Sequence, residues 1–315
     1  MTVMLVNPGG GMRVYDAMGR KKGRNRLDAQ CDAVRGAGVD VIVMPEARLD
    51  SATERVARTY VGRAYGGEVA FEAAPTSAAA ARMEMGDATV CVGEEGAGIV
   101  CLLGSRVATA VEFSDEQRNF VSGRILWVRL RVNSTVLNIV GVYGVSSPMS
   151  TPRKRRVNKL VSEELRRVLA ACDRRDEPTL LLADMNTVEH PHDRRTGQLH
   201  AYDTNEHAIW RTVKEYGYTA THAARHPARV DFTYTEGGVG VSKIDAIFAN
   251  RRLLAWGGGR GQWPIRSAVA GQPEPFSPDH RAEVLHLPGP FLWEKGGAGG
   301  GSSVSGSALG PGGRP

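Results

Sequence analysis

The sequence has few cysteines and no long hydrophobic run, and both shortages exclude whole classes of protein. Its four cysteines stand apart in a chain of 315 residues, with no CxxC pair. A zinc knuckle needs cysteines paired at short spacing, and a disulfide scaffold needs a dense, even set. No apolar stretch reaches the length of a membrane span, and no basic segment precedes the short apolar run near the N-terminus. We therefore expect a soluble, intracellular protein of a reducing compartment.

The composition is basic and suffices for one large domain. The chain is 42% hydrophobic, with 40 lysines and arginines against 34 acidic residues, a net charge of +6 and a pI near 9.3. A basic chain attracts polyanions through salt-sensitive electrostatics that do not depend on sequence. Part of the excess lies in two clusters, at 20–26 and 153–156. Each cluster alone is also typical of a solvated loop or helix start.

Apolar runs of strand length recur along the chain. They are VMLV (3–6), VDVIVM (39–44), TVCV (89–92), IVCLL (99–103), ILWVRLRV (125–132), TVLNIVGVY (135–143), TLLLA (179–183), DFTYT (231–235) and KIDAIFA (243–249). Helical periodicity is found at 26–35, 54–65 and 155–172. Strands at 89–103 and 125–143 follow one another without a helix, which predicts hairpins. Together these elements predict an α/β fold, a four-layer α/β sandwich of two mixed β-sheets flanked by helices.

The domain organisation expected is simple. Residues 1–290 are expected to form one domain, and residues 291–315 a disordered tail. The stretch from 296 onward is rich in glycine and serine and cannot bury a core. No internal repeat stands out.

Polar residues follow or end several of the apolar runs. They are Asn7, Glu46, Tyr143, Asp184, Asn186, Asp245, Asp279 and His280. Each alone has an ordinary structural explanation, such as a turn, a helix cap or a strand aromatic. Taken together they are hard oxygen donors with one histidine beside a carboxylate, the groups that Mg²⁺ and a phosphodiester require.

The motifs that carry these residues occur in a recognisable order. They are LVN (5–7), MPE (44–46), VYGVSSP (142–148), ADMN (183–186), SKID (242–245) and SPDH (277–280). This order resembles that of the endonuclease/exonuclease/phosphatase superfamily, over nearly all of the chain before the Gly-rich tail. The superfamily includes apurinic endonucleases, retrotransposon endonucleases, inositol-polyphosphate phosphatases and neutral sphingomyelinases. This chain departs from the usual pattern at Pro45, Ala183 and Pro278, and at Gly9, where many members carry an acidic residue.

The resemblance implies Mg²⁺-dependent phosphodiester hydrolysis, with Mn²⁺ able to substitute. Glu46 would bind the metal, with Asn7 and Asp279 as further ligands or neighbouring groups. Asp184 would orient and deprotonate the attacking water, helped by Asn186.

The resemblance also assigns the groups that contact the phosphate. His280, oriented by Asp245, would hydrogen-bond the scissile phosphate, either as a general base or as a charged clamp. Tyr143 would touch the phosphate or support the leaving group. The number of metal ions stays open.

Local motifs favour DNA as the substrate. The order of Tyr143, a long helix, DMN (184–186) and the run DFTYTEGGVGVSKID (231–245) resembles endonucleases of non-LTR retrotransposons. The residues expected to contact nucleic acid are Arg153, Lys154, Arg155, Lys21, Lys22, Thr233 and Tyr234. For the last two, ordinary strand surface is an equal alternative.

Other branches of the superfamily stay open or rank lower. The Trp-x-Gly-Asp-x-Asn pattern of inositol phosphatases is missing, and sphingomyelinase-like members are usually secreted or membrane-anchored. Abasic-site repair is the nearest alternative, followed by a small-phosphoester phosphatase. A third is a catalytically weak nucleic-acid-binding module that has lost a ligand at Gly9. A retrotransposon enzyme would act on DNA in the nucleus, without a membrane, and would belong to a longer polyprotein with a reverse transcriptase.

Overall fold

The structure of the chain is a computed structural model. It describes residues 1–7, 39–46, 71–73, 99–103, 111–113, 122–132, 135–146, 150–200, 208–236, 239–255, 266–269 and 279–287. Among the helices of these residues, none is long and apolar enough to span a membrane.

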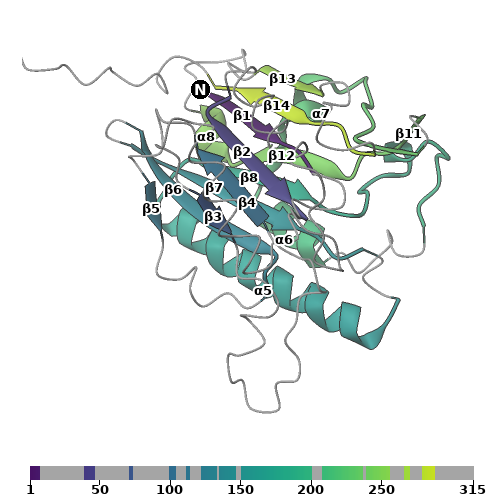
Figure 1. Cartoon of the computed structure of the whole chain (residues 1–315), viewed down its shortest axis with the longest axis horizontal. Coiled ribbons are helices and arrows are strands. Elements are labelled where there is room, and N and C mark those ends of the chain that lie inside the picture. Colours follow the sequence, from purple (N-terminus) through teal and green to yellow (C-terminus); the bar gives the residue numbers. More distant parts are fainter. Residues whose placement is uncertain are drawn as a thin grey trace, which may run out of the picture.

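The first of two six-stranded sheets contains the N-terminal strand (Figure 1). Its strand order is β13-β14-β1-β2-β4-β3. The bounds are β1 Thr2–Leu5, β2 Val41–Pro45, β3 Phe71–Ala73, β4 Ile99–Leu103, β13 Arg266–Val269 and β14 Glu283–His286. Strand β1 runs parallel to β2 and antiparallel to β14, so this sheet is mixed.

The second sheet is also mixed, with the order β5-β6-β7-β8-β12-β9. Its strands are β5 Val111–Phe113, β6 Ile125–Val132, β7 Thr135–Tyr143, β8 Thr179–Asp184, β9 Thr219–Ala220 and β12 Asp245–Ala249. Strand β7 is parallel to β8, whereas β12 is antiparallel to it. A short hairpin is formed by β10 Tyr234–Glu236 and β11 Val239–Ser242.

The helices of the described residues are α5 Pro152–Arg174, α6 Ala208–Glu215, α7 Thr221–Arg225 and α8 Arg251–Ala255, with a 3₁₀ turn η2 at Pro191–Asp193. Helix α5 lies along one side of the layered strands, with α6 beside it (Figure 1). It begins earlier than the periodicity at 155–172 predicted, because the Thr151 side chain accepts a hydrogen bond from the Lys154 backbone N–H and Pro152 starts the first turn.

Two apolar layers hold the sheets and helices together, and β8 contributes to both. Leu180 and Leu182 pack in the core between the two sheets. Leu181 and Ala183 point the other way, toward the buried face of α5. Successive side chains of a strand face opposite sides, so a central strand buried on both sides is apolar throughout. This is why TLLLA could be recognised as a strand from sequence.

The structure confirms the predicted α/β fold with two mixed sheets and helices. The predicted strands near 3–6, 39–44, 99–103, 125–132, 135–143, 179–183 and 243–249 are present with small shifts in their ends. DFTYT is shorter than expected, since β10 begins only at Tyr234. The strand predicted at 89–92, the helices at 26–35 and 54–65 and the tail lie outside the described residues.

Candidate active site

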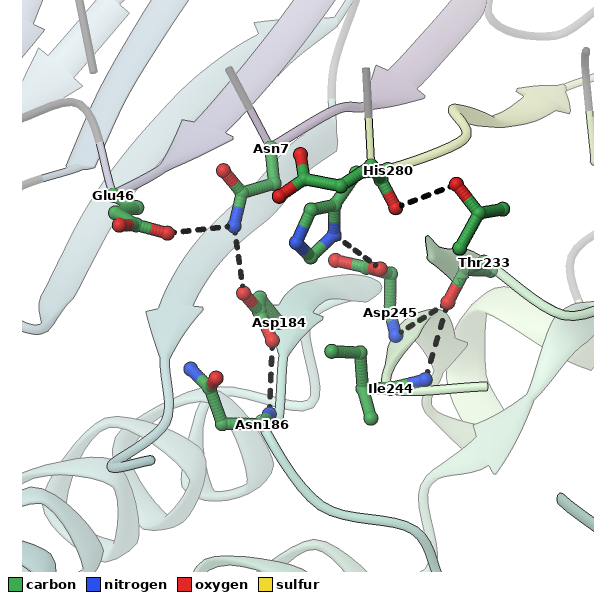
Figure 2. Close-up of polar contacts among 10 residues, drawn as sticks. Asn7, Glu46, Asp184, Asn186, Thr233, Ile244, Asp245 and His280 are labelled. Atoms are coloured by element: carbon green, nitrogen blue, oxygen red, sulfur yellow. Dashed lines mark hydrogen bonds and ion pairs between the residues drawn. The ribbon is translucent and has the colours of Figure 1, made fainter. Parts of the chain in front are cut away.

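The strand directions bring distant residues to one edge of the two sheets. Asn7 follows β1 and Glu46 follows β2, and these strands are parallel. Asp184 ends β8, and antiparallel pairing places it opposite Asp245 at the start of β12. The same rule brings His280 to this edge, because β14 runs antiparallel to β1. Figure 2 shows these five side chains meeting in one place.

Asn7 links the two sheets at this edge. Its Nδ2 donates to Glu46 Oε2 at 3.1 Å and to Asp184 Oδ2 at 2.8 Å (Figure 2). The side chain is only 1% exposed. One amide therefore orients a carboxylate from each sheet, and its own carbonyl oxygen is not used in either bond.

The chain turns sharply after Asp184. The Asn186 backbone N–H donates to Asp184 Oδ1 at 2.8 Å, and Asn186 has a left-handed φ of 55°. Asparagine tolerates that conformation better than most residues. Glu46 also has a positive φ, 56°, which is uncommon for glutamate. Of the three residues other than glycine that have a positive φ in the described chain, Glu46 and Asn186 carry polar groups of the candidate site, and Asp176 lies elsewhere.

His280 and Asp245 form a buried pair. His280 Nδ1 lies 2.9 Å from Asp245 Oδ2, and the two side chains are 7% and 1% exposed. Asp245 Oδ1 is buried and has no hydrogen-bond partner among the described residues. A buried carboxylate oxygen without a partner is expensive in free energy, so it marks a place where a proton or a cation is expected to bind.

Thr233 holds the backbone on which Asp245 of this pair lies. Its hydroxyl oxygen accepts hydrogen bonds from the backbone N–H groups of Ile244, at 3.1 Å, and Asp245, at 2.9 Å (Figure 2). Its carbonyl accepts from the Arg281 N–H at 2.7 Å, next to His280. The predicted contact of Thr233 with nucleic acid is wrong, because its side chain is completely buried. The hydroxyl holds the backbone of Asp245 instead.

Tyr234, also predicted to contact nucleic acid, is half-buried. Its ring meets the His280 imidazole edge to face, with ring centroids 5.3 Å apart. Tyr234 therefore borders the site, where a contact with a substrate stays a prediction.

The electrostatics of the site are dominated by two carboxylates that face one another. Burial and the charge of Asp245 raise the pKa of Asp184 to about 7, although His280 opposes this shift. Burial by itself would lower the pKa of His280, but Asp245, followed by Asp184 and Asp279, outweighs burial and raises it to about 9. One proton or cation shared among the three groups relieves the repulsion between the carboxylates.

The described residues offer two sets of donors for a cation. Ligand atoms of Asp184, Asp245 and His280 all lie within 4.8 Å of one another. The set implied by the resemblance, Glu46 with Asn7 and Asp279, borders the same place through the Asn7 bonds to Glu46 and Asp184. Both sets are rich in hard oxygen atoms, and the unpartnered Asp245 Oδ1 also fits a cation. The donor chemistry therefore suits a divalent metal ion.

Tyr143 is held by a residue that the sequence did not reveal. The Arg124 guanidinium lies 4.6 Å from the centroid of the Tyr143 ring. Its Nη1 donates to the carbonyls of Tyr143, at 3.2 Å, and Gly144, at 2.7 Å. The Asn186 side chain donates to the same Gly144 carbonyl at 3.0 Å. Arg124 is fully buried, and its only signal in sequence is a charged residue directly before an apolar strand.

Gly144 is needed where the chain leaves β7. A Cβ at this position would lie 2.6 Å from the carbonyl carbon of Met185, which is backbone and cannot move aside easily. The Gly144 N–H donates to the Asp184 carbonyl at 2.6 Å. Glycine therefore permits the close approach that connects Tyr143 to the Asp184 turn.

The predicted basic contacts lie partly within the described chain. Arg153 and Arg155 are exposed at the start of α5. Lys154 is half-buried, and its Nζ donates to the Ser146 carbonyl at 2.9 Å, in the segment that follows Tyr143. This bond ties the start of α5 to the rim of the site. Lys21 and Lys22 lie outside the described residues.

In this site, buried carboxylates, an oriented imidazole and an asparagine meet at the edge of a two-sheet α/β sandwich. No family model and no curated protein matches the sequence. Solved structures do match. The AP endonuclease LMAP from Leishmania major is 14% identical with a TM-score of 0.66, over 90% of this chain and 86% of that one.

Two further solved structures have different activities in their descriptions. The 3' phosphatase NExo from Neisseria, bound to a product DNA hairpin, is 13% identical with a TM-score of 0.61, over 91% of this chain and 99% of that one. The endonuclease domain of TRAS1, a telomere-specific non-LTR retrotransposon, is 13% identical with a TM-score of 0.54, over 90% of this chain and 96% of that one. The chain therefore shares its overall fold with these solved structures.

Proposed function

We propose that this protein is a Mg²⁺-dependent phosphodiesterase that nicks duplex DNA, as in the cleavage of a retrotransposon target. The observation that carries this proposal is the junction of Asp184, Asp245 and His280 within 4.8 Å, with Asn7 bonded to Asp184. Like charges and an imidazole gathered in a buried place reduce stability, which is typical of catalytic sites.

The residues divide the reaction among themselves. Asp184 accepts the proton of the attacking water, which suits its pKa of about 7, and Asn186 helps to place the water. His280 keeps Nδ1 on Asp245 and donates from Nε2 to a phosphate oxygen. Glu46, Asn7 and Asp279 would hold Mg²⁺, which when bound would supply Lewis-acid stabilisation of charge on the phosphoryl oxygens.

Tyr143 completes the set as the group that touches the phosphate or supports the leaving oxygen. It ends β7 directly beside Asp184, its partner in the parallel pairing of β7 with β8. Arg124 and Gly144 fix its position through the contacts described above.

DNA is supported as the substrate by charge and by the known relatives of the fold. Arg153 and Arg155 stand exposed at the start of α5, near the rim that Lys154 ties down. The net charge of +6 favours a polyanion. The Neisseria phosphatase in its solved structure is bound to a product DNA hairpin, and the TRAS1 structure is the endonuclease domain of a non-LTR retrotransposon.

The abasic-site endonuclease is a second candidate. Solved structures of the same fold from Archaeoglobus fulgidus and Leishmania major are both described as AP endonucleases. Their substrate differs from an intact duplex by one missing base, and the same phosphodiester chemistry serves both.

The test compares nicking of supercoiled plasmid with cleavage of a duplex that contains one abasic site, in Mg²⁺, in Mn²⁺ and in EDTA. His280→Ala and Glu46→Ala are measured beside His192→Ala and Glu163→Ala, whose side chains are 66% and 51% exposed. We expect metal-dependent nicking that only the first two variants lose. A strong preference for the abasic duplex assigns repair instead.

Three results overturn the proposal. Hydrolysis of small phosphoesters with intact DNA left uncut assigns a phosphatase. Salt-sensitive DNA binding by folded protein, without cleavage in either metal, assigns a binding module. Nicking that survives in both site variants places the chemistry elsewhere in the chain.

A further inference from the structure

The two members of the His280–Asp245 pair lie on segments that lead to different sheets. Asp245 is the first residue of β12, in the second sheet, and His280 precedes β14, in the first. The 2.9 Å contact between His280 Nδ1 and Asp245 Oδ2 therefore depends on how the two sheets pack against each other. A small slide between β12 and β14 would lengthen it, and hydrogen bonds weaken steeply with distance and angle.

A buried glutamate connects these two strands close to the pair. Glu283, the first residue of β14, is completely buried, and its Oε2 accepts from the Ile247 N–H of β12 at 3.1 Å. Its Oε1 accepts from the Thr221 hydroxyl at 3.2 Å. Thr221 Oγ1 also lies 3.0 Å from the Ile247 carbonyl oxygen. Glu283 thus serves the Ile247 N–H, and the single hydrogen of the Thr221 hydroxyl is shared between Glu283 Oε1 and the Ile247 carbonyl.

The reason for this arrangement lies in the sheet. Strand β9 pairs with β12 only at Phe248 and Ala249, and the chain then leaves the sheet at Thr221 to begin α7. Ile247 needs other partners where β9 has ended, since unpaired buried backbone groups are costly. Side chains supply them, and one of these side chains belongs to the opposite sheet.

Residues of the apolar core lie close to Glu283. Ile247 and Leu285, on either side of the contact, belong to the core between the sheets. A carboxylate in such a place destabilises the fold unless it is hydrogen-bonded, and an apolar side chain would pack there without that requirement. What the carboxylate adds is a directional bond between β12 and β14.

We propose that Glu283, together with Thr221, is a positioning residue that fixes β12 against β14 and so holds Asp245 on His280. The expected effect on catalysis rests on the proposed function, whereas the expected effect on the His280–Asp245 contact does not. Glu283 is three residues from His280 in sequence, and Ile247 is two from Asp245. The hydrogen bonds of Glu283 and Thr221 with Ile247, which together form the clasp, therefore lie close in sequence to the His280–Asp245 pair.

The chemistry of the clasp allows a matched pair of variants. In Glu283→Gln, the amide oxygen accepts from Ile247 N–H and the amide nitrogen donates to Thr221, whose hydroxyl then donates to the Ile247 carbonyl. Every bond of the clasp is kept. In Glu283→Leu, the volume is similar but the Ile247 N–H loses its acceptor.

The first readout is spectroscopic and needs no activity. The Nδ1 proton of His280, assigned by its loss in His280→Gln, is followed by NMR in wild type and in both Glu283 variants. We expect the hydrogen-bonded signal in wild type and Glu283→Gln, and its loss or exchange broadening in Glu283→Leu. Asn250→Leu is the control, because Asn250 also bonds backbone groups through its side chain but lies at the far end of β12.

The second readout is DNA nicking at matched folded fraction. Glu283→Leu is expected to lose about 10-fold in kcat with KM little changed, because misplacement of a catalytic group acts on the chemical step. Glu283→Gln is expected to keep kcat within about 3-fold, since it restores the bonds. Asn250→Leu should lower thermal stability without this loss of kcat.

The outcomes separate the two proposals. A normal His280 signal in folded Glu283→Leu overturns the clasp, whether or not the protein cleaves DNA. Loss of the signal in Glu283→Gln as well as in Glu283→Leu also overturns it, because the bonds were then not the cause. Absence of cleavage in wild type with the expected NMR pattern overturns the proposed function and leaves the clasp supported.

Discussion

The two ends of strands β7 and β8 both carry buried or half-buried polar residues, and they differ in how these residues are paired. At the end where the strands begin, the Glu177 carboxylate accepts from Arg129 Nη2 at 2.7 Å and from Asn138 Nδ2 at 2.9 Å. Trp127 donates to the Asn138 side-chain oxygen at 2.8 Å. Opposite charges and matched donors therefore stabilise this end.

At the other end, the strands finish at Tyr143 and Asp184. Asp184 faces Asp245, so carboxylates meet carboxylates, and Asp245 Oδ1 is buried without a partner among the described residues. A fold does not need such an arrangement for its stability. Buried polar residues alone therefore do not mark a functional site. Buried carboxylates that face one another without matched partners do mark one.

The largest effect that tests this comparison is expected for Asp184→Asn. Removal of the proposed base should reduce nicking by about 10³-fold. Because burial raises the folded pKa of Asp184 from 3.8 to about 7, ionisation destabilises the fold as pH rises across that interval. The variant should therefore melt higher than wild type at pH 8 and no higher at pH 4. Calorimetry at both pH values measures this, and a lower melting temperature at pH 8 contradicts it.

Asp245→Asn is expected to have the next largest effect, about 10²-fold on kcat, because His280 loses the partner that orients it. NMR titration should show the pKa of His280 falling from about 9 toward or below 6.5, since burial then acts with less opposition. In wild type this raised pKa stabilises the fold below pH 6.5, and the contribution disappears as pH rises through 9. A titration unchanged by the substitution would refute the role of Asp245.

Gly144→Ala tests the link between Tyr143 and the Asp184 turn. The added Cβ meets the backbone of Met185, so the two segments must separate. We expect a loss of about 1–3 kcal/mol in the free energy of unfolding, from overpacking, and a fall in kcat on the order of 10-fold. Gly197→Ala, whose Cβ would meet nothing within 4 Å, controls for the loss of a glycine, although its own φ of 66° adds strain. Unchanged kcat in Gly144→Ala would contradict the link.

The smallest effect on activity is expected at the opposite end of the strands. Glu177→Gln places a donor against Asn138 Nδ2 or Arg129 Nη2, so one bond is lost. This should lower the free energy of unfolding by about 1–3 kcal/mol and leave kcat and KM unchanged. Chemical denaturation and plasmid nicking measure the two quantities. A fall in kcat larger than the loss of folded protein accounts for would show that this end of the strands also affects activity, and the distinction between the two ends would be lost.

Much of the fold was predictable because its signals are local. TLLLA and TVLNIVGVY are continuous apolar runs of central strands, and α5 has one apolar face over its whole length. Strand β14 was missed, because its first residue, Glu283, is a buried charge and sequence periodicity treats a charge as surface. The short helices α7 and α8 span five residues each, too few for a helical period to show.

The polar residues of the candidate site could be listed from the sequence, whereas the residues that hold them in place could not. The order of Asn7, Glu46, Asp184, Asp245 and His280 along the chain was sufficient to suggest a metal-dependent phosphodiesterase. For Thr233 the sequence left a nucleic-acid contact and ordinary strand surface equally open, and its burial was not predicted, because exposure of a residue between strands depends on what packs over it. Arg124 was not singled out, since its contacts with Tyr143 and Gly144 lie about twenty residues away in sequence.

The sequence by itself determined the inventory of this protein: the strands, the long helix, and the acidic, amide and imidazole groups at the ends of apolar runs. These depend on neighbours within a few residues, where periodicity and residue type carry the information. The tertiary structure alone decided which of these groups meet, for example Asn7 with Asp184 across 177 residues. It also decided that Asp245 and His280 meet across two sheets, because contacts between strands distant in sequence arise only when the sheets pack.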